Sequence, residues 1–349
     1  MTLRTRALAA TLLLTSSCLV QAACPTADAA GEDRATIILR SDNDLYGREG
    51  QDQGYTNGFL ATYVSPNLDS FTEDPCLPTA ARWVNRALGW LQPGNAAEKN
   101  MVLSFSHSTY TPTDGTRSDL ILNDRPYAAV GMLGVGYNGR DGSHLSSTHL
   151  RLGMVGPSTR GKMGQDALHR WFGRPRFQGW NNQVRDEVLV QLLHERLWRR
   201  GFAISERGWR WDAIGHIGGS LGNLATHANA GGELRFGKHL PDDFGTDPLR
   251  PAGENSAPGQ RDGFVDRWRW HLFVGLDARW VLHDVTLDGN TSKDSHSVER
   301  RDGVADLSLG IALTRGPWKI AGSHVRRTRE FEGQLEAPVF GTLSFSRSF

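Results

Sequence analysis

Alternation of apolar and polar side chains dominates the C-terminal half of the chain. In RWRWHLFVGLDARW, every second residue from Trp268 to Trp280 is apolar, and most residues between them are Arg, His, Gly or Asp. The same period of two runs through 303–314, 226–237 and 208–221. A period of two gathers the apolar side chains on one face of a strand. The pattern therefore predicts long strands with one apolar and one polar face.

Twelve such strands can be counted along the chain. Strands of about 10 to 14 residues are long for a soluble sheet but suit a tilted strand in a membrane. An even number is what a single-chain bacterial barrel requires. Alternation is weakest in the sixth segment, where apolar residues fall on both faces. The segments lie near 35–43, 55–65, 101–110, 127–137, 147–155, 188–198, 208–221, 226–237, 267–281, 303–314, 318–329 and 339–349.

The chain end and the tryptophans favour the same fold. LSFSRSF places Leu343, Phe345 and Phe349 on one face, an ending that resembles the last strand of bacterial outer-membrane barrels. Aromatic girdles at both membrane interfaces would explain tryptophans near strand ends, as at Trp198 and Trp318. We expect an all-β fold, a transmembrane antiparallel β-barrel of about 12 strands with a short helix in an extracellular loop. The alternative is a secreted β-sandwich or a lipocalin-like barrel.

The N-terminal segment resembles a secretory signal. Residues 1–22 combine Arg4 and Arg6, an apolar run and a small-residue ending, VQA. Residues 23–349 would then form the mature barrel domain. A lipoprotein processing site at Cys18 is a weaker alternative, since Thr15 stands where an aliphatic residue is usual. Removing the two arginines takes the formal charge from +1 to −1, so nothing in the charge balance indicates nucleic-acid binding.

Two cysteines remain in the mature chain, Cys24 and Cys76. An exported protein reaches an oxidising compartment, where they could form a disulfide, but two unpaired thiols are an equally good interpretation. The sequence contains no CxxC or CxxH motif, so it gives no sign of a cysteine-based metal site. After the signal, no apolar run approaches the roughly 20 residues of a spanning helix.

Two segments between the predicted strands have apolar side chains at helical spacing. Residues 77–91 set Trp83, Val84 and Ala87 on one side of a helix. A second, short helix is predicted near Gly161–Phe172, where Gln165 and His169 are four residues apart and share a face.

Antiparallel threading decides which polar segments meet. If the N-terminus starts on the periplasmic side, the loops after strands 1, 3 and 5 all lie at the outer rim. Asn43, Asp44 and Thr56 flank the first of these loops, and Arg117, Asp124 and Arg125 lie in the second. The helix with Gln165 and His169 lies in the third. The other end receives the helix 77–91 and the segment 239–266.

Each of these residues also has an ordinary structural interpretation. Asn and Asp favour turns, Thr is common in strands, and a surface His or Arg is usually inert. Their convergence on one rim supports a hydrolytic site. His169 could act as a general base on water, Gln165 could orient it, and Asp44 and Asn43 offer hard oxygen ligands for Ca²⁺. Arg117 could pair with a phosphate or an oxyanion, and Thr56 could bind water.

A covalent route is less well supported, because no Ser lies in a G-x-S-x-G setting. A metal-assisted attack of water on an ester fits the residues better. The chemistry alone does not separate Ca²⁺ from another hard divalent ion.

The ordered set of segments resembles the outer-membrane lipid A 3′-O-deacylases. The resemblance covers essentially the whole mature chain, through DND (42–44), GYTNGFLATYVSP (54–66), NDRPYAAVGMLGVGY and, most specifically, RLGMVGPSTRGKMGQDALHRWFGRPRFQGWNNQ (151–183). It implies a twelve-stranded barrel and a Ca²⁺-dependent hydrolase that releases the 3′-acyloxyacyl chain of lipid A.

The resemblance also implies site residues. The family's Asn-Asp pair corresponds to Asn43 and Asp44, its threonine to Thr56, and its Gln-x-x-x-His pair to Gln165 and His169, with His169 as the base. A basic loop residue that is Lys in the family falls on Arg117, and Arg and Lys are not interchangeable at a directed contact. Two alternatives stay open: an outer-membrane phospholipase or esterase on another lipid, and a non-enzymatic pore. The oligomeric state also stays open.

Overall fold

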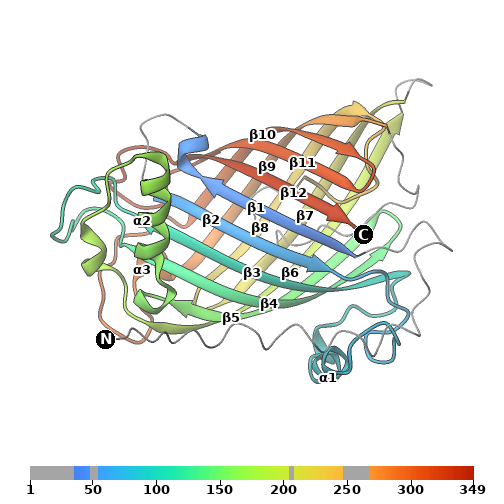
Figure 1. Ribbon diagram of the computed structural model, residues 1–349, viewed down its shortest axis with the longest axis horizontal. Helices are drawn as coiled ribbons and strands as arrows, with labels where there is room; N and C mark the ends of the chain where they lie inside the picture. The colour runs from blue at the N-terminus through green and yellow to red at the C-terminus, as the bar shows by residue number, and fades with distance from the viewer. Residues whose placement is uncertain (1–34, 48–53, 204–207, 247–266) are drawn as a thin grey trace, which may run out of the picture.

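The chain folds into a closed barrel of twelve antiparallel strands. The structure is a computed structural model that describes residues 35–47, 54–203, 208–246 and 267–349. Each strand pairs with its neighbours in chain order, and β1 closes the barrel on β12 (Figure 1). The predicted number, order and direction of the strands are confirmed. Their bounds are β1 Thr36–Asn43, β2 Gly54–Val64, β3 Glu98–Thr111, β4 Ala128–Asp141, β5 His144–Val155, β6 Glu187–Ala203, β7 Trp209–Gly222, β8 Ala225–Lys238, β9 Arg269–Asp284, β10 Gly303–Arg315, β11 Trp318–Arg327 and β12 Val339–Ser348.

Helices lie at both ends of the barrel. The predicted helix 77–91 is α1 (Thr79–Ala87) followed by the 3₁₀ turn η2 (Gly89–Leu91). At the opposite end, which we call the α2 end, lies α2 (Gly161–Phe172), with the bounds that the sequence predicts. The short α3 (Val285–Asp288) was not predicted. The remaining 3₁₀ turns are η1 (Asp44–Tyr46), η3 (Pro157–Thr159) and η4 (Gly179–Asn182).

A buried asparagine fixes α1 to the barrel. The Asn85 amide donates to the Phe71 carbonyl at 2.6 Å and accepts from the Tyr137 hydroxyl at 2.8 Å. Most of the remaining α1 side chains stay at least partly exposed, including Trp83. The helix is therefore held by these two hydrogen bonds and by Ala81, which packs against the apolar cluster around Tyr137.

Apolar side chains cover the outside of the barrel wall. They alternate along the strands with buried polar ones, as the period of two predicts, so the polar face lines the lumen. No helix in the described ranges is long and apolar enough to span a membrane. Exposed apolar residues of the strands include Ile37, Leu39, Phe59, Tyr63, Leu103, Phe105, Leu133, Leu152, Leu234, Leu272, Val274, Leu276, Leu307, Leu309, Ile311, Ile320 and Leu343.

Buried ion pairs fill much of the lumen. Arg235 bonds the carboxylates of Asp212 and Asp243, and Arg327 bonds those of Asp306 and Glu330. Removing one partner of such a pair leaves an uncompensated buried charge, which costs about 3–5 kcal/mol. These pairs join neighbouring strands, β7 with β8 and β10 with β11, and fix the segments that follow β8 and β11 to the interior.

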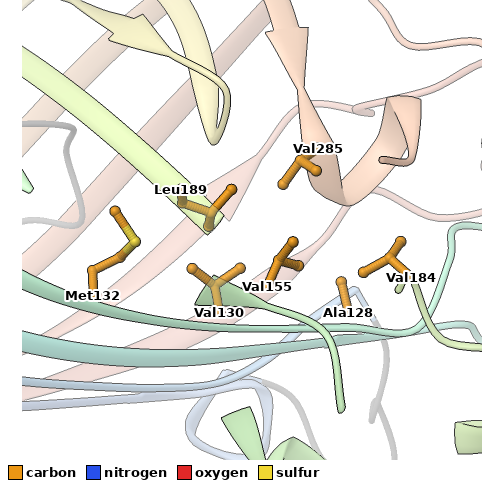
Figure 2. Packing of buried hydrophobic residues seen from close by; sticks show 7 residues of the cluster. All are labelled: Ala128, Val130, Met132, Val155, Val184, Leu189 and Val285. Atoms are coloured by element: carbon orange, nitrogen blue, oxygen red, sulfur yellow. The ribbon is translucent and has the colours of Figure 1, made fainter. Parts of the chain in front are cut away.

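An apolar cluster fills the interior of the barrel near the α2 end. Figure 2 shows Val130, Val155 and Leu189 from three neighbouring strands meeting Val285 of α3 and Val184, which follows η4. Val184 also donates its amide to the Tyr127 carbonyl at 2.9 Å. The segment that returns from α2 to β6 is thus fixed to the barrel by packing and by a backbone hydrogen bond.

Arg125 joins three loops at the α2 end. Its guanidinium donates to Glu330 Oε2 at 3.0 Å and to Thr286 Oγ1 at 3.1 Å, and the side chain is buried. Sequence reasoning grouped Arg125 with the candidate site residues of its loop. The structure places it in the interior, where it links the loops after β3, β9 and β11.

This arrangement predicts an acid-sensitive contribution to stability. Burial alone would raise the pKa of the Glu330 carboxyl, but the Arg125 and Arg327 guanidiniums outweigh burial and hold that pKa below its usual range. The folded state then binds fewer protons than the unfolded state near the usual glutamate pKa of about 4.3. The stabilisation is present above that pH and is lost as the pH falls through the folded pKa.

Thermal denaturation of purified protein between pH 7 and pH 3 checks this prediction. Glu330→Gln should be less stable than wild type at neutral pH and should lose less stability on acidification. Glu336→Gln, in the same loop, serves as the control. If the melting temperatures of Glu330→Gln and wild type fell equally steeply with pH, the Glu330 carboxylate would not contribute to the acid sensitivity of the fold.

Cys76 takes part in a disulfide bond. Cys24 and the predicted signal segment 1–22 lie outside the described residues.

Candidate active site

Asn43 and Asp44 lie where β1 ends at the α2 end. Asn43 pairs in register with Asn57 of β2, and their side-chain amides are hydrogen-bonded to each other. Asn43 Oδ1 also accepts from the Leu45 amide at 2.7 Å, which caps η1. Asp44 is the first residue of η1 and only 1% exposed. The loop between β1 and β2 therefore begins with a fixed, buried carboxylate.

A β-bulge determines which way Thr56 faces. Tyr55 pairs with Tyr110 and Asn57 pairs with Thr109, so Thr56 is an extra residue in β2. Its hydroxyl lies 2.6 Å from the hydroxyl of Thr111 at the end of β3. Thr111 has the same parity as Phe105, which faces outward, whereas Tyr55 points inward and donates to Asp42. The bulge thus places Thr56 on the outside of the wall.

Helix α2 covers this part of the wall from outside. Figure 1 shows it crossing the ends of the strands, and it contacts β3 and β4. Gly161 allows the close approach: a Cβ there would overlap Ala129 and would lie 3.3 Å from the Thr109 Cγ2. The His107 ring, on the same outer face, lies 3.1 Å from the Thr159 carbonyl just before the helix.

The face that α2 buries is polar. Gly161, Gln165 and His169 are its buried residues and are spaced four apart. Met163 and Trp171 are exposed. The helix therefore turns its two candidate side chains toward the outer barrel wall and its apolar ones away from it.

Gln165 is held by a tryptophan. Trp180 Nε1 donates to Gln165 Oε1 at 2.7 Å, and both side chains are 1% exposed. This contact fixes the orientation of the amide, because the indole is only a donor. Gln165 Nε2 is buried and has no hydrogen-bond partner in the described structure. A buried donor of this kind is suited to bind a substrate oxygen or a water.

The orientation of the His169 ring is fixed by a backbone contact. Its Nδ1 lies 2.6 Å from the Pro175 carbonyl, which can only accept, so Nδ1 carries the proton. In the neutral ring Nε2 then has the lone pair. Phe177 packs edge-on against the ring, with centroids 5.2 Å apart. A neutral imidazole held in one tautomer is suited to accept a proton from water.

Arg117 lies in the loop after β3 and is exposed. Its guanidinium pairs with Asp119 two residues along, and the hydrogen bond to that carboxylate, together with its negative charge, raises the pKa of the guanidinium. The loop itself reaches the site, since Gly115 accepts a backbone hydrogen bond from Gln178 at 2.9 Å and the Ser118 carbonyl accepts from Asn182. The structure therefore brings the backbone around Arg117 against η4, while the side chain pairs locally.

The structure places five of the six candidates in one region. Asn43, Asp44 and Thr56 lie at the ends of β1 and β2, and α2 with Gln165 and His169 lies over the adjacent β3 and β4. Thr111 connects Thr56 to β3. Trp180, Thr111 and Phe177 were not singled out from the sequence. The sequence signal that could have pointed to Phe177 and Trp180 is the pair of aromatic residues three apart in RFQGWNN.

A separate cavity of about 210 Å³ lies inside the barrel. Its lining includes Asp42, Tyr55 and Arg327, and none of the six candidate residues. The lumen and the candidate site are thus on opposite sides of the wall.

The donors near β1 suit a hard cation. Asp44 supplies a buried carboxylate, and amide and hydroxyl oxygens of Asn43, Asn57 and Thr56 lie on the neighbouring positions. Within the described ranges, no group of three His, Cys, Asp or Glu side chains could hold a metal. An oxygen donor set with one carboxylate fits Ca²⁺ and does not fit Zn²⁺.

Comparison with solved structures agrees with the barrel fold. The solved structure of LpxR from Salmonella typhimurium matches with a TM-score of 0.70 and 15% identity, over 90% of this chain and 100% of that chain. At this identity the likeness shows the fold alone. The β domain of the Bordetella autotransporter BrkA matches with a TM-score of 0.39 and 11% identity, over 91% and 99% of the two chains. That value is too low to support an argument.

No curated protein matches the sequence. The family model described as outer membrane protein LpxR matches residues 9–349, nearly the whole chain. The chain therefore belongs to the LpxR family of outer-membrane proteins.

Proposed function

We propose that this protein is an outer-membrane hydrolase that removes the 3′-linked acyloxyacyl chain of lipid A. His169 acts as the general base on the water that attacks the ester carbonyl, and Asn43 and Asp44 would hold a Ca²⁺ ion, which would polarise that carbonyl. One observation carries the proposal: α2 buries Gln165 and His169 against the outer barrel wall, beside Asn43, Asp44 and Thr56. Membership of the LpxR family supports the substrate.

The proposed base is set up by its surroundings. The Pro175 carbonyl holds the proton on Nδ1, so Nε2 takes the proton of the attacking water. Phe177 restricts the rotation of the ring. The imidazolium then returns the proton to the leaving alkoxide, which is the sugar oxygen of the ester.

Gln165 and Thr56 position the reacting groups. Trp180 holds the Gln165 carbonyl oxygen, which directs Nε2 to the site, where it donates to the water or to the ester oxygen. The Thr56 hydroxyl is held by Thr111 and offers a further hydrogen bond. Preorganised donors of this kind contribute because they need no reorientation as charge develops.

Asp44 and Asn43 would hold the Ca²⁺ ion, with Asn57 as a neighbouring oxygen donor. When bound, the ion would polarise the ester carbonyl and stabilise negative charge on its oxygen. The Asn43–Leu45 cap and the Asn43–Asn57 contact keep these donors in place.

The location suits a lipid substrate. The site lies on the outside of a wall whose strands expose apolar side chains to the membrane, and α2 covers the ends of β3 and β4 from that side. With the α2 end facing outward, the site is level with the outer leaflet, where lipid A resides. The ester can then reach His169 from the membrane without entering the lumen.

Mass spectrometry of lipid A tests the function. Cells that express the protein should yield lipid A that has lost the mass of one 3′-linked acyloxyacyl chain, compared with cells carrying an empty vector. Unchanged lipid A in calcium-replete cells would contradict the proposal. Fatty acid released from phospholipid instead would identify a phospholipase, and ion conductance without acyl release would identify a pore.

A further inference from the structure

Helix α2 exposes apolar side chains on the face opposite its buried polar residues. Trp171 is 86% exposed and Met163 is 60% exposed, and Ala167 lies between them on the same face. Leu168 and Phe172 are also exposed. A cluster of exposed apolar side chains on one helix face marks an interaction surface or a membrane contact.

The register places this face at the edge of the membrane. On β3, Phe105 is an outward-facing aromatic residue, and its ring packs 6.4 Å from that of Phe59. Four residues farther along the strand, Thr109 lies beneath Gly161 of α2. At about 3.3 Å per residue, the helix lies roughly 13 Å along the strand from the lipid-facing aromatic pair. Phe105 lies near the middle of β3, so the helix lies toward the α2 edge of the lipid-exposed band of the wall.

Basic side chains surround the exposed apolar face. The segment 160–176 contains Arg160, Lys162, Arg170, Arg174 and Arg176 against a single carboxylate, Asp166, whereas the whole chain has a formal charge of only +1. Asp166 pairs with Lys162. Arg170, Arg174 and Arg176 are exposed. An apolar face beside clustered arginines is typical of a helix that lies in an anionic membrane surface.

We propose that the outer face of α2 docks into the leaflet at the α2 end. Met163, Ala167 and Trp171 enter the acyl-chain region, and Arg170, Arg174 and Arg176 bind phosphate groups of the glycolipid surface. The apolar face continues the lipid-exposed barrel wall, so the helix extends an existing membrane contact. Docking sets α2 at the level of the acyl chains, and because its inner face carries Gln165 and His169, the site lies at that same level of the membrane. This last step rests on the proposed function.

Labelling at single positions tests the docking without reference to activity. A nitroxide on Met163→Cys, in vesicles that contain lipid A, should be more accessible to oxygen than to a water-soluble nickel chelate. Leu133→Cys on the lipid-exposed wall gives the membrane reference, and Ser143→Cys in the exposed turn after β4 gives the aqueous reference. Accessibility at Met163 equal to that at Ser143 would overturn the proposal, whether or not the protein deacylates lipid A.

A kinetic comparison tests the consequence for substrate. The double substitution Met163→Ser and Trp171→Ser should lower kcat/KM for lipid A in vesicles by about tenfold, mainly through KM, because burial of two large side chains in the membrane is lost. On lipid A dispersed in detergent, its activity should stay within about twofold of wild type. Trp83→Ser, an exposed tryptophan on α1, is the matched control. An equal loss in vesicles and in detergent would indicate a structural role and would contradict docking.

Discussion

Replacing His169 with alanine is expected to reduce kcat for lipid A deacylation by about 10²- to 10⁴-fold, the usual contribution of a general base. The barrel should fold and insert normally, because α2 keeps its other contacts with the wall and with Trp180. The fold is monitored by the heat-dependent shift in gel mobility, and activity by release of the 3′-linked chain. KM should change little, since the ring acts on the water.

His144→Ala provides the matched control, because this histidine is exposed at the opposite end of the barrel. It should retain wild-type activity. Full activity in the His169 variant would remove this residue from the mechanism. A variant that failed to insert would be replaced by His169→Gln, which keeps a hydrogen-bonding side chain of similar length without the basic nitrogen.

Replacing Asp44 with asparagine is expected to lower activity strongly at calcium concentrations that just saturate the wild type. The substitution preserves shape but removes the carboxylate, the one charged ligand in the proposed set. We expect the apparent affinity for Ca²⁺ to fall at least about tenfold, since ligand charge sets the affinity of oxygen sites. Wild-type activity should be lost on chelation and should return when Ca²⁺ is restored.

Calorimetric titration of Ca²⁺ into each protein gives a second measurement that does not depend on turnover. Asp141→Asn, at the end of β4 opposite the site, should bind Ca²⁺ as the wild type does. Wild-type activity that persists after chelation would contradict the metal role, as would unchanged Ca²⁺ affinity in the Asp44 variant.

The barrel could be predicted because its strands repeat one simple physical rule. Lipid on one side and a polar lumen on the other impose a period of two on almost every strand, from Ile37 to Phe345. Even β6, where apolar residues fall on both faces of the sequence pattern, takes its predicted place between β5 and β7. The short α3 was missed because four residues are too few to show helical periodicity.

Much of the candidate site also followed from the sequence. Threading predicted that the loops after β1, β3 and β5 meet, and the spacing of Gln165 and His169 predicted their common face. The direction of Thr56 could not be predicted, because a bulge shifts the alternation by one residue and no residue type in GYTNGF requires it. Trp180 escaped for a different reason: its partner Gln165 is fifteen residues away and on another element.

Arg125 illustrates what residue chemistry alone leaves open. Arg125 and Arg117 are both basic and both lie in the loop after β3. By these features alone, each could be a site residue. Only the partners distinguish them, since Arg125 bonds Glu330, about two hundred residues later in the chain, inside the barrel. Such long-range pairs are set by the closure of the barrel and leave no local pattern.

The position of α2 on the outside of the wall determines how the protein would meet its substrate. A catalyst that opens sideways to a membrane encounters lipid by diffusion in two dimensions, so its rate follows the surface density of the lipid and not its bulk concentration. A change in membrane packing would then change the turnover rate, because it changes how often lipid reaches the site. The lumen, which takes no part in this encounter, can remain filled with ion pairs.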